Sequence, residues 1–423
     1  MRVLISGAGI AGPTLAWFLA RTGARVTVVE KCKSIPTYGH NVDVNHSAIT
    51  VLKKMGLIDQ LRRFNTTEKG TQFIDPKGRP FAPFPVKDGS SASPTSEFEI
   101  LRGDLAVVLY EATKTHPNIE YLFSTTAVKV ISNDETAVKV ELSNGEVQEY
   151  DLLVAADGQW SKVRKQVFPQ ESITVIDKNM YVAYAAIPRL PEDNDWWNIY
   201  QALGSRIITT RPDPHGTIRA MFTHMPCEGA QKTAWQEASR GDKKLQMELV
   251  RREFLDAGWQ TPRIMDAMMQ AEDYYFQDLK QIKMDRWSSS RVICLGDAAF
   301  APTPLSGMGT TLAIIGGYML AGELTKLKPG EHPSRAFETY EAAFRPYVEE
   351  TQSVPWFFPA VAHPVTAWQR WLLGSVVSTI SRVIAMPWVA RRFFDDTNND
   401  DSEFPLPAYP ELADEMKLKD DSL

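Results

Sequence analysis

The first thirty residues constrain the fold most strongly, because they place a glycine-rich turn between two apolar strands. Residues 2–6 and 25–30 are short apolar runs, and a helix-like stretch over 13–21 lies between them. The first run leads directly into Gly7-Ala8-Gly9-Ile10-Ala11-Gly12. This order predicts a βαβ unit whose helix directs its N-terminal N–H groups at an anionic ligand.

The three glycines of this turn have separate roles in binding a dinucleotide. Gly7 permits the tight turn, Gly9 lets the backbone approach a pyrophosphate, and Gly12 lets helix and strand pack closely. Glu30 ends the second strand, where its carboxylate can accept hydrogen bonds from ribose hydroxyls. The motif therefore predicts an adenine dinucleotide and leaves both FAD and NAD open.

Composition excludes several other classes of protein. A chain of 423 residues is too long for one ordinary core, which indicates two or more domains. Residues 391–423 carry ten acids and four bases, which equals the whole net charge of −6, so the rest has no basic footprint for nucleic acid. Three cysteines without metal-ligand spacing and a start that enters a strand directly favour a cytoplasmic protein without a metal.

A second ligand-binding turn is predicted near residue 300. An apolar strand over 291–295 runs into Gly296-Asp297, and a Pro-rich loop then leads to Gly307-Met308-Gly309 and a long helix. The Asp297 carboxylate can accept hydrogen bonds from a polyol, and the helix N-terminus favours an anion such as a reduced flavin. The alternative is a capped helix with an incidental aspartate.

Two further groups of residues place charged side chains near the starts of predicted helices. Arg102 opens a helix and could reach a phosphate or a ribityl oxygen, unless it is an ordinary surface arginine. Asp157-Gly158 ends an apolar run over 151–156 and is followed by Ser161 and Arg164. The alternative for this third motif is a strand-to-helix turn with an exposed arginine.

These three motifs together resemble the fingerprints of the class A flavoprotein monooxygenases, the para-hydroxybenzoate hydroxylase family. The matching patterns are Gly7/Gly9/Gly12 with Glu30, Asp157-Gly158-x-x-Ser161-x-x-Arg164, and Gly296-Asp297-Ala298-Ala299 with Pro304-x-x-Gly307-x-Gly309. Their order and spacing agree over about residues 1–350. The overall length, the Arg102 helix and the C-terminal helix are most similar to the tetracycline-inactivating and polyketide-tailoring members.

The resemblance implies a discontinuous α/β architecture. A Rossmann-like FAD-binding domain would comprise 1–70, 98–178 and 285–350, and an inserted substrate domain with an antiparallel sheet would comprise 71–97 and 179–284. A helical segment over 351–394 and an acidic tail over 395–423, expected to be frayed, would follow. For the helical segment we expect packing on the body of the protein, with a membrane-surface helix as the alternative.

The resemblance also implies the cofactor and the reaction. FAD would be bound non-covalently, and NAD(P)H, which has no Rossmann unit of its own here, would reduce it. Reaction with O₂ would give a C4a-hydroperoxide that hydroxylates an aromatic or polyketide-like molecule. The implied cofactor contacts are Gly7, Gly9, Ile10, Ala11, Gly12, Glu30, Lys31, Arg102, Asp157, Gly158, Arg164, Gly296, Asp297, Pro304, Gly307, Met308 and Gly309.

Substrate contacts are expected on the inner face of the antiparallel sheet, with ordinary sheet or loop packing as the alternative for each candidate. The candidates are Tyr184, Thr210, Arg211, Phe222 and His224. Of these, Tyr184, Arg211 and His224 are also the candidates for assisting catalysis, and Arg211 or His224 would bind an acidic or phenolic group. His40 and Asn41 are expected near the flavin edge.

Three other activities stay open at this point. The main alternative is a flavin-dependent reductase or dehydrogenase that does not use O₂. A halogenase would carry Trp-x-Trp-x-Ile, which Trp196-Trp197-Asn198-Ile199 only approximates and in the wrong domain. A flavin-binding protein without catalysis is the third. We expect a small-molecule substrate, no nucleic-acid or membrane partner, and a monomer or weak dimer.

Overall fold

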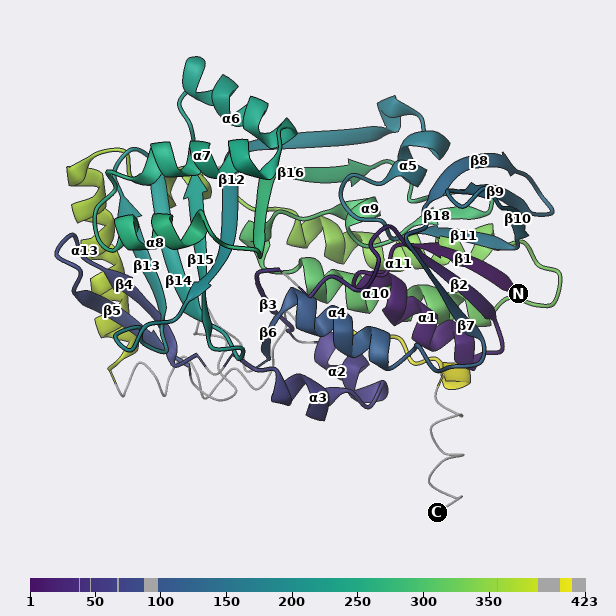
Figure 1. Cartoon of the computed structure of the whole chain (residues 1–423). Helices are drawn as coiled ribbons and strands as arrows, with labels where there is room; N and C mark the ends of the chain where they lie inside the picture. Colours follow the sequence, from purple (N-terminus) through teal and green to yellow (C-terminus); the bar gives the residue numbers. More distant parts are fainter. Residues whose placement is uncertain are drawn as a thin grey trace.

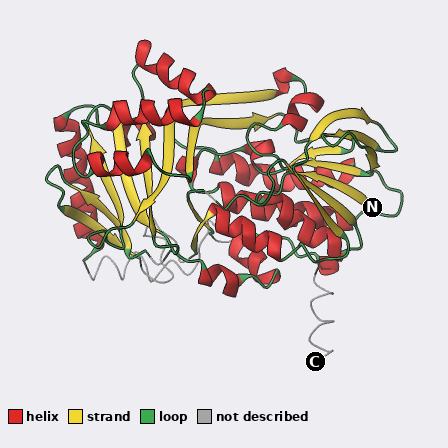
Figure 2. Ribbon diagram, viewed as in Figure 1, coloured by secondary structure: helices red, strands yellow, loops and turns green. Residues whose placement is uncertain are grey.

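The computed structural model describes residues 1–37, 39–45, 47–66, 68–86, 98–355, 357–386 and 404–412. Two parts lie side by side, one built on a largely parallel sheet and the other on a largely antiparallel sheet (Figures 1 and 2). Residues 87–97 and 387–394, which belong to the predicted substrate domain and C-terminal segment, lie outside the described residues.

The parallel sheet has six strands in the order β17-β18-β11-β1-β2-β7. Its strands are β1 (Arg2–Ser6), β2 (Arg25–Glu30), β7 (Ile119–Phe123), β11 (Leu152–Ala155), β17 (Ser288–Ser289) and β18 (Val292–Cys294). All neighbours pair in parallel except β17, which is antiparallel to β18. The central strands are continuous apolar runs because both faces of the sheet are covered.

Helices cover one face of this sheet and a small second sheet covers the other (Figure 1). The helices of this part are α1 (Ala11–Arg21), α2 (Ser47–Lys54), α3 (Ile58–Arg63), α4 (Arg102–Glu111), α5 (Lys162–Val167), α9 (Asp297–Phe300), α10 (Gly309–Thr325) and α11 (Ser334–Thr351). The small sheet comprises β8 (Ala127–Asn133), β9 (Val138–Leu142) and β10 (Val147–Tyr150). Helix α10 is buried from Thr311 to Leu324, so it is the central helix of the core.

The antiparallel sheet has seven strands in the order β16-β12-β15-β14-β13-β4-β5. Its strands are β4 (Gly70–Ile74), β5 (Pro80–Pro85), β12 (Ile173–Pro188), β13 (Trp197–Ala202), β14 (Arg206–Pro212), β15 (Thr217–His224) and β16 (Tyr274–Met284). Helices α6 (Ala230–Arg240), α7 (Lys243–Phe254) and α8 (Thr261–Met268) cover one face and form a separate apolar core with it. A two-stranded sheet of β3 (Asn41–Asp43) and β6 (Glu99–Leu101) lies between the two parts.

The predicted C-terminal helical segment contains α12 (Phe358–Ala362) and α13 (Ala367–Ile384). Helix α13 packs against β5 at the outer edge of the antiparallel sheet, as Figure 1 shows at the left. The expectation of a frayed tail is wrong for residues 404–412. Tyr409 is only 3% exposed, its hydroxyl donates to Glu323 Oε1 at 2.8 Å, and a Cβ at Gly322 would lie 2.3 Å from its ring.

We therefore expect truncation to have a position-dependent effect. Removing residues 404–423 would uncover the side of α10 that Tyr409 covers, and loss of a buried aromatic side chain costs about 3–5 kcal/mol of unfolding free energy. Removing only 413–423 should retain this contribution of Tyr409, because residues 404–412 remain. Urea unfolding of both truncated proteins would measure this, and equal stability of the two would contradict it.

Candidate active site

The three predicted motifs meet at one edge of the parallel sheet, at the ends of four strands. Gly7 follows β1, Glu30 ends β2, Asp157 comes two residues after β11, and Gly296-Asp297 follow β18. Parallel strands present their carboxyl ends at a common edge, which is where open α/β sheets bind ligands. Segments nearly 290 residues apart in the sequence thereby form a single site.

Two of the three glycines in the turn have no room for a side chain, and the third faces open space. A Cβ at Gly7 would lie 2.4 Å from the Ala156 carbonyl oxygen, and one at Gly12 would lie 2.1 Å from the Gly7 carbonyl oxygen. A Cβ at Gly9 would meet only the Arg102 guanidinium, at 3.6 Å. Ile10 and Ala11 are buried, so only their backbone can serve a ligand. Gly9 is therefore the glycine whose open side can face a pyrophosphate.

Glu30 is buried and holds the backbone around the turn. Its carboxylate accepts hydrogen bonds from the backbone N–H groups of Ala8 and Cys32, both at 3.0 Å. The acid therefore stabilises the turn itself, in addition to any contact with a ribose. Lys31, the next residue, is exposed.

Asp297 and Arg102 line the site with opposite charges. Both residues are accessible to solvent. The surrounding protein atoms nevertheless desolvate the Asp297 carboxylate and raise its pKa, and the positive charge of Arg102 opposes that rise. The Arg102 guanidinium has no hydrogen-bond partner among the described residues. An accessible guanidinium and an accessible carboxylate in one site suit a polar cofactor that carries phosphate and hydroxyl groups.

Two helix N-termini complete this polar region. Helices α1 and α10 both begin without an acidic residue in the first turn, so their positive ends are left for an external anion. Gly307 has a left-handed backbone with φ +65°, and a Cβ at Gly309 would lie 3.9 Å from Asp297 Oδ1. Pro304 and Met308 belong to the same loop, next to Asp297. These polar groups fit FAD, because backbone N–H groups can donate to its anionic oxygens and the Asp297 carboxylate can accept from its hydroxyl groups.

Asp157 is only partly satisfied. Its Oδ2 accepts from the Lys162 N–H at 2.9 Å, whereas its Oδ1 is buried without a partner within the described ranges. Gly158 has φ +83°, so the turn after β11 requires a residue that tolerates the left-handed region. The free carboxylate oxygen leaves Asp157 able to accept a hydrogen bond from a ligand.

Arg164 is buried and engaged by backbone carbonyls, so the exposed arginine considered as the alternative for this motif is wrong. The side chain is 2% exposed, and its guanidinium donates to the carbonyl oxygens of Ala298 and Gln159, both at 2.7 Å. The sequence could not distinguish a solvated arginine from one that spans two loops. Because Ala298 directly follows Asp297, Arg164 connects α5 to the segment that carries the acid.

We expect Arg164→Met to weaken FAD binding without removing a cofactor contact. The buried Ala298 carbonyl would lose its donor, at about 1–3 kcal/mol, and so would the partly buried Gln159 carbonyl. Arg164→Lys should not restore binding, because an ammonium group lacks the planar fork that reaches both carbonyls. Fluorescence titration with FAD checks this, and binding by Arg164→Met equal to wild type would refute the positioning role.

The face of the antiparallel sheet opposite the α6–α8 helices is apolar at its centre. Met180, Val182 and Leu279 form a small buried cluster there, and Tyr184 and Met221 pack against it with Leu305 from the loop before α10. Leu305 belongs to the loop that precedes Gly307, so this face meets the proposed flavin site. Tyr184 stacks on His40, with ring centroids 4.7 Å apart. Burial and the charges of Arg102 and Arg211 lower the pKa of His40 to about 3, so this ring is neutral.

Three predicted substrate residues lie on the other face, and the inward orientation expected for them is wrong. Phe222 and His224 pack against Phe254 in the core under the helices, and Thr210 pairs with Ala220 on the same side. Burial lowers the pKa of His224 to about 4. Successive side chains of a strand point to opposite faces of the sheet, and the sequence did not show which of the two alternating sets faces the helices.

Arg211 does lie on the face that carries Tyr184, but its guanidinium is already paired. Its Nε donates to Glu68 at 2.6 Å, its Nη2 forms an ion pair with Glu99, and its guanidinium carbon lies 4.1 Å from the Trp197 ring centroid. Both carboxylates are at most 2% exposed. Burial and the neighbouring Glu68, opposed by Arg211, raise the pKa of Glu99 well above its usual range.

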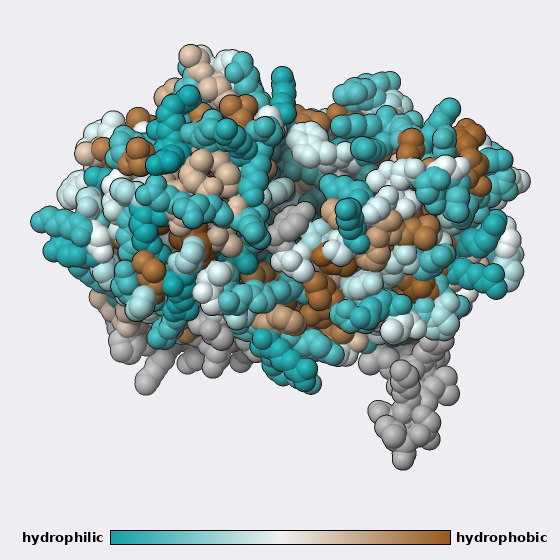
Figure 3. All heavy atoms as spheres, viewed as in Figure 1, coloured by the Kyte–Doolittle hydropathy of each residue, from teal (hydrophilic) through white to brown (hydrophobic). Residues whose placement is uncertain are grey.

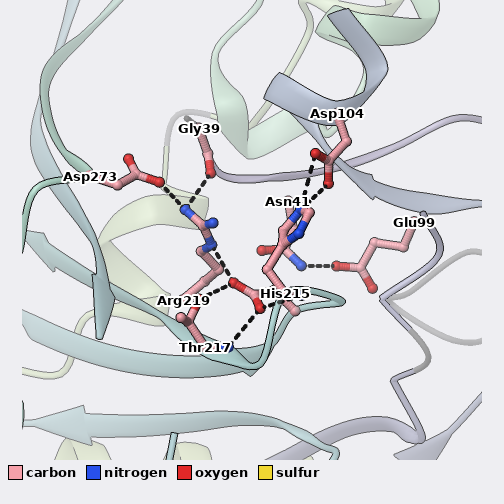
Figure 4. Close-up of polar contacts among 9 residues, drawn as sticks. Gly39, Asn41, Glu99, Asp104, His215, Thr217, Arg219 and Asp273 are labelled. Atoms are coloured by element: carbon pink, nitrogen blue, oxygen red, sulfur yellow. Dashed lines mark hydrogen bonds and ion pairs between the residues drawn. The ribbon is translucent and has the colours of Figure 1, made fainter. Parts of the chain in front are cut away.

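A second polar network joins the two parts of the molecule (Figure 4). Arg219 on β15 donates to the Gly39 carbonyl at 3.4 Å and pairs with Asp213 and Asp273. His215, at the end of the same hairpin, meets Asp104 of α4 at 2.8 Å. Asn41 donates to Glu99 at 2.8 Å, so it also serves this junction.

Sequence reasoning missed Glu68, Glu99 and the pair formed by Asp104 and His215. None of them belongs to a motif, and a buried carboxylate has the same sequence signature as a solvated one. Their partners come from strands and helices more than 100 residues away. Only the tertiary arrangement identifies them as parts of the junction.

Comparison with known proteins agrees with this geometry. The family model described as "FAD binding domain" matches residues 1–353. A monooxygenase of Cercospora beticola, CTB7, is 36% identical over 90% of this chain and 92% of its own, and the FAD-dependent monooxygenase asL4 of Sarocladium schorii is 32% identical over 98% and 99%.

A solved structure shows the same overall arrangement. The crystal structure of the tetracycline destructase Tet(55) superposes with a TM-score of 0.75 at 27% identity, covering 96% of this chain and 98% of that one. The resemblance inferred from the three motifs and the Rossmann-like fold class are therefore confirmed. The chain belongs to the FAD-binding-domain family and is an FAD-dependent monooxygenase.

Proposed function

We propose that this enzyme uses NAD(P)H and O₂ to hydroxylate an aromatic or polyketide-like small molecule. The observation that carries the proposal is the meeting of two surfaces. Leu305, from the loop between Asp297 and Gly307 of the proposed FAD site, packs on the apolar sheet surface around Tyr184 and Met221. In this division the parallel-sheet part binds the cofactor, and the antiparallel-sheet part binds the substrate.

The proposed cofactor contacts use the accessible groups of the site. Arg102 and the α1 N-terminus would hold the pyrophosphate, Asp297 the ribityl hydroxyls, Glu30 the adenosine ribose, and the α10 N-terminus the isoalloxazine oxygens. When bound, FAD supplies the electron transfer and oxygen activation that no amino-acid side chain provides. The protein binds, orients and excludes water from the reacting molecules.

The substrate class is supported by the chemistry of the sheet surface. Tyr184 stacks on both His40 and Tyr275, so flat rings already pack against one another on this surface. The similarity to a tetracycline destructase favours a polycyclic molecule with several oxygen substituents. A planar, electron-rich ring system is the substrate that this surface accommodates best.

Isotope labelling tests the proposal. One oxygen atom of O₂ should enter the product and the other should leave as water, with one NAD(P)H oxidised per product formed. The purified holoenzyme is incubated with NADH or NADPH and a panel of phenols and polyketides under ¹⁸O₂, and products are analysed by mass spectrometry. Product formation under argon at an undiminished rate would instead establish the reductase or dehydrogenase alternative.

A further inference from the structure

The structure assigns a lipid-binding surface to α12 and α13, and we propose that this surface binds membranes containing anionic phospholipid. The proposal is independent of the oxidation chemistry. None of the described helices is long and apolar enough to cross a membrane, so the binding concerns the bilayer surface.

The contacts that attach helix α13 to the protein come from small and polar residues along one of its sides. Ser381 donates to the Pro83 carbonyl at 2.8 Å, Arg370 reaches the Gln201 carbonyl at 3.5 Å, and a Cβ at Gly374 would lie 3.6 Å from the Phe81 ring. Ser381 is the one buried residue of this helix. In an ordinary amphipathic helix the largest apolar side chains face the core, whereas both tryptophans of α13 face away from it.

The opposite side of α13 presents large apolar side chains to solvent. Trp368 is 63% exposed and Trp371 is 71% exposed. Leu372, Val376, Ile380 and Val383 continue the same face at helical spacing, and each is at least 40% exposed. The helix has 18 residues and is therefore about 27 Å long. Exposed apolar areas of this extent mark interaction sites.

The exposed apolar residues of α13 are joined by others in α12, in contrast to the mixed surface seen elsewhere on the molecule. On the face of the molecule drawn in Figure 3, hydrophobic groups are interspersed with hydrophilic ones. Just before α13, Phe358 and Val361 of α12 and Val365 of the following loop are also about half exposed. Exposed apolar residues thus begin in α12 and continue along the chain into α13.

Charge selects an anionic bilayer as the occupant. Residues 357–386, the described part of this segment, contain two arginines and no carboxylate, whereas the whole chain has a net charge of −6. Arg382 is exposed on α13 beside the apolar face. Tryptophan and arginine are the residues that interfacial helices use to bind acidic headgroups and the acyl boundary. A purely apolar dimer interface would not require this depletion of acids.

Co-sedimentation with vesicles tests the proposal. The full-length holoenzyme should sediment with vesicles of phosphatidylcholine and phosphatidylserine and much less with phosphatidylcholine alone. Trp368→Ala/Trp371→Ala should reduce the partition coefficient roughly tenfold, because binding scales with the apolar area inserted. Arg382→Gln should reduce only the preference for phosphatidylserine.

Trp160 provides the matched control, because it is 50% exposed but lies before α5 in the other part of the molecule. Trp160→Ala should sediment like wild type, and all variants should retain FAD. The proposal fails if none of the proteins binds either vesicle, or if Trp160→Ala lowers binding as much as the double variant. It also fails if sedimentation velocity without lipid shows a dimer that the double variant abolishes.

Discussion

Replacing Gly9 with alanine should abolish tight FAD binding while leaving the fold intact, whereas Gly12→Ala should destabilise the fold itself. The two residues lie three positions apart in one turn. A Cβ at Gly9 has only the flexible Arg102 side chain nearby, at 3.6 Å. A Cβ at Gly12 would overlap the Gly7 carbonyl oxygen at 2.1 Å and approach Ile5 at 3.2 Å.

The expected magnitudes follow from these contacts. A methyl group on Gly9 would stand between the turn and the pyrophosphate, and a steric cost of about 1–3 kcal/mol raises the dissociation constant of FAD about 10- to 100-fold. In the protein without FAD, this variant should unfold within about 1 kcal/mol of wild type. For Gly12→Ala, α1 must shift away from β1, at a cost of about 3 kcal/mol or more in unfolding free energy.

Urea unfolding of the flavin-free proteins and flavin fluorescence titration separate the two effects. Each variant is the control for the other, since both add one methyl group to the same turn. If Gly9→Ala destabilised the flavin-free protein as much as Gly12→Ala, the open side of Gly9 would be structural. Unchanged FAD affinity in Gly9→Ala would remove the turn from the proposed cofactor site.

The sequence predicted this region well because local chemistry determined it. The order of strand, Gly7 to Gly12 turn and helix needs only neighbouring residues to form, and the polarity of a βαβ unit places its turn at the ligand-binding edge. Gly296-Asp297 could be added because a parallel strand ending in that pair leads to the same edge. In each case the motif and its structural context lie within about twenty residues.

The substrate sheet shows where sequence reasoning stops. Tyr184 and Arg211 lie on the sheet face opposite the α6–α8 helices, whereas Thr210, Phe222 and His224 lie under those helices. The alternation of side chains between the two faces is visible in the sequence. Which set lies against the helices depends on how α6–α8, which follow later in the chain, pack on the sheet. The same applies to Tyr409, whose packing on α10 depends on a contact 86 residues distant.

Removing the Arg211 side chain should cost the enzyme much of its stability, because two buried acids would lose their cation. Arg211 pairs with Glu68 and Glu99, and both are almost fully buried. Removing one partner of a buried ion pair lowers the unfolding free energy by about 3–5 kcal/mol, because the charge of the other partner is then uncompensated. We therefore expect Arg211→Met to lower the unfolding free energy by that amount.

Neutralising the acids should rescue the variant. Arg211→Met/Glu68→Gln/Glu99→Gln leaves no uncompensated charge, and apolar or neutral replacement of a whole buried ionic cluster is often close to neutral in stability. Glu99→Gln alone, with Arg211 and Glu68 retained, is the matched single variant. Failure of the triple variant to recover would show that packing of Arg211 on Trp197, at 4.1 Å, dominates its contribution.

The pH dependence gives the same network a second, independent test. Burial raises the pKa of Glu99 in the folded protein above its ordinary value of 4.5, so the folded state retains a proton that the unfolded chain releases. Stability must then fall as pH rises through that interval. Without Arg211 the pKa of Glu99 rises further, so Arg211→Met should lose more stability at pH 8 than at pH 5. A variant with wild-type stability at both pH values and a raised KM would instead make Arg211 the substrate-binding residue that its position on the sheet first suggested.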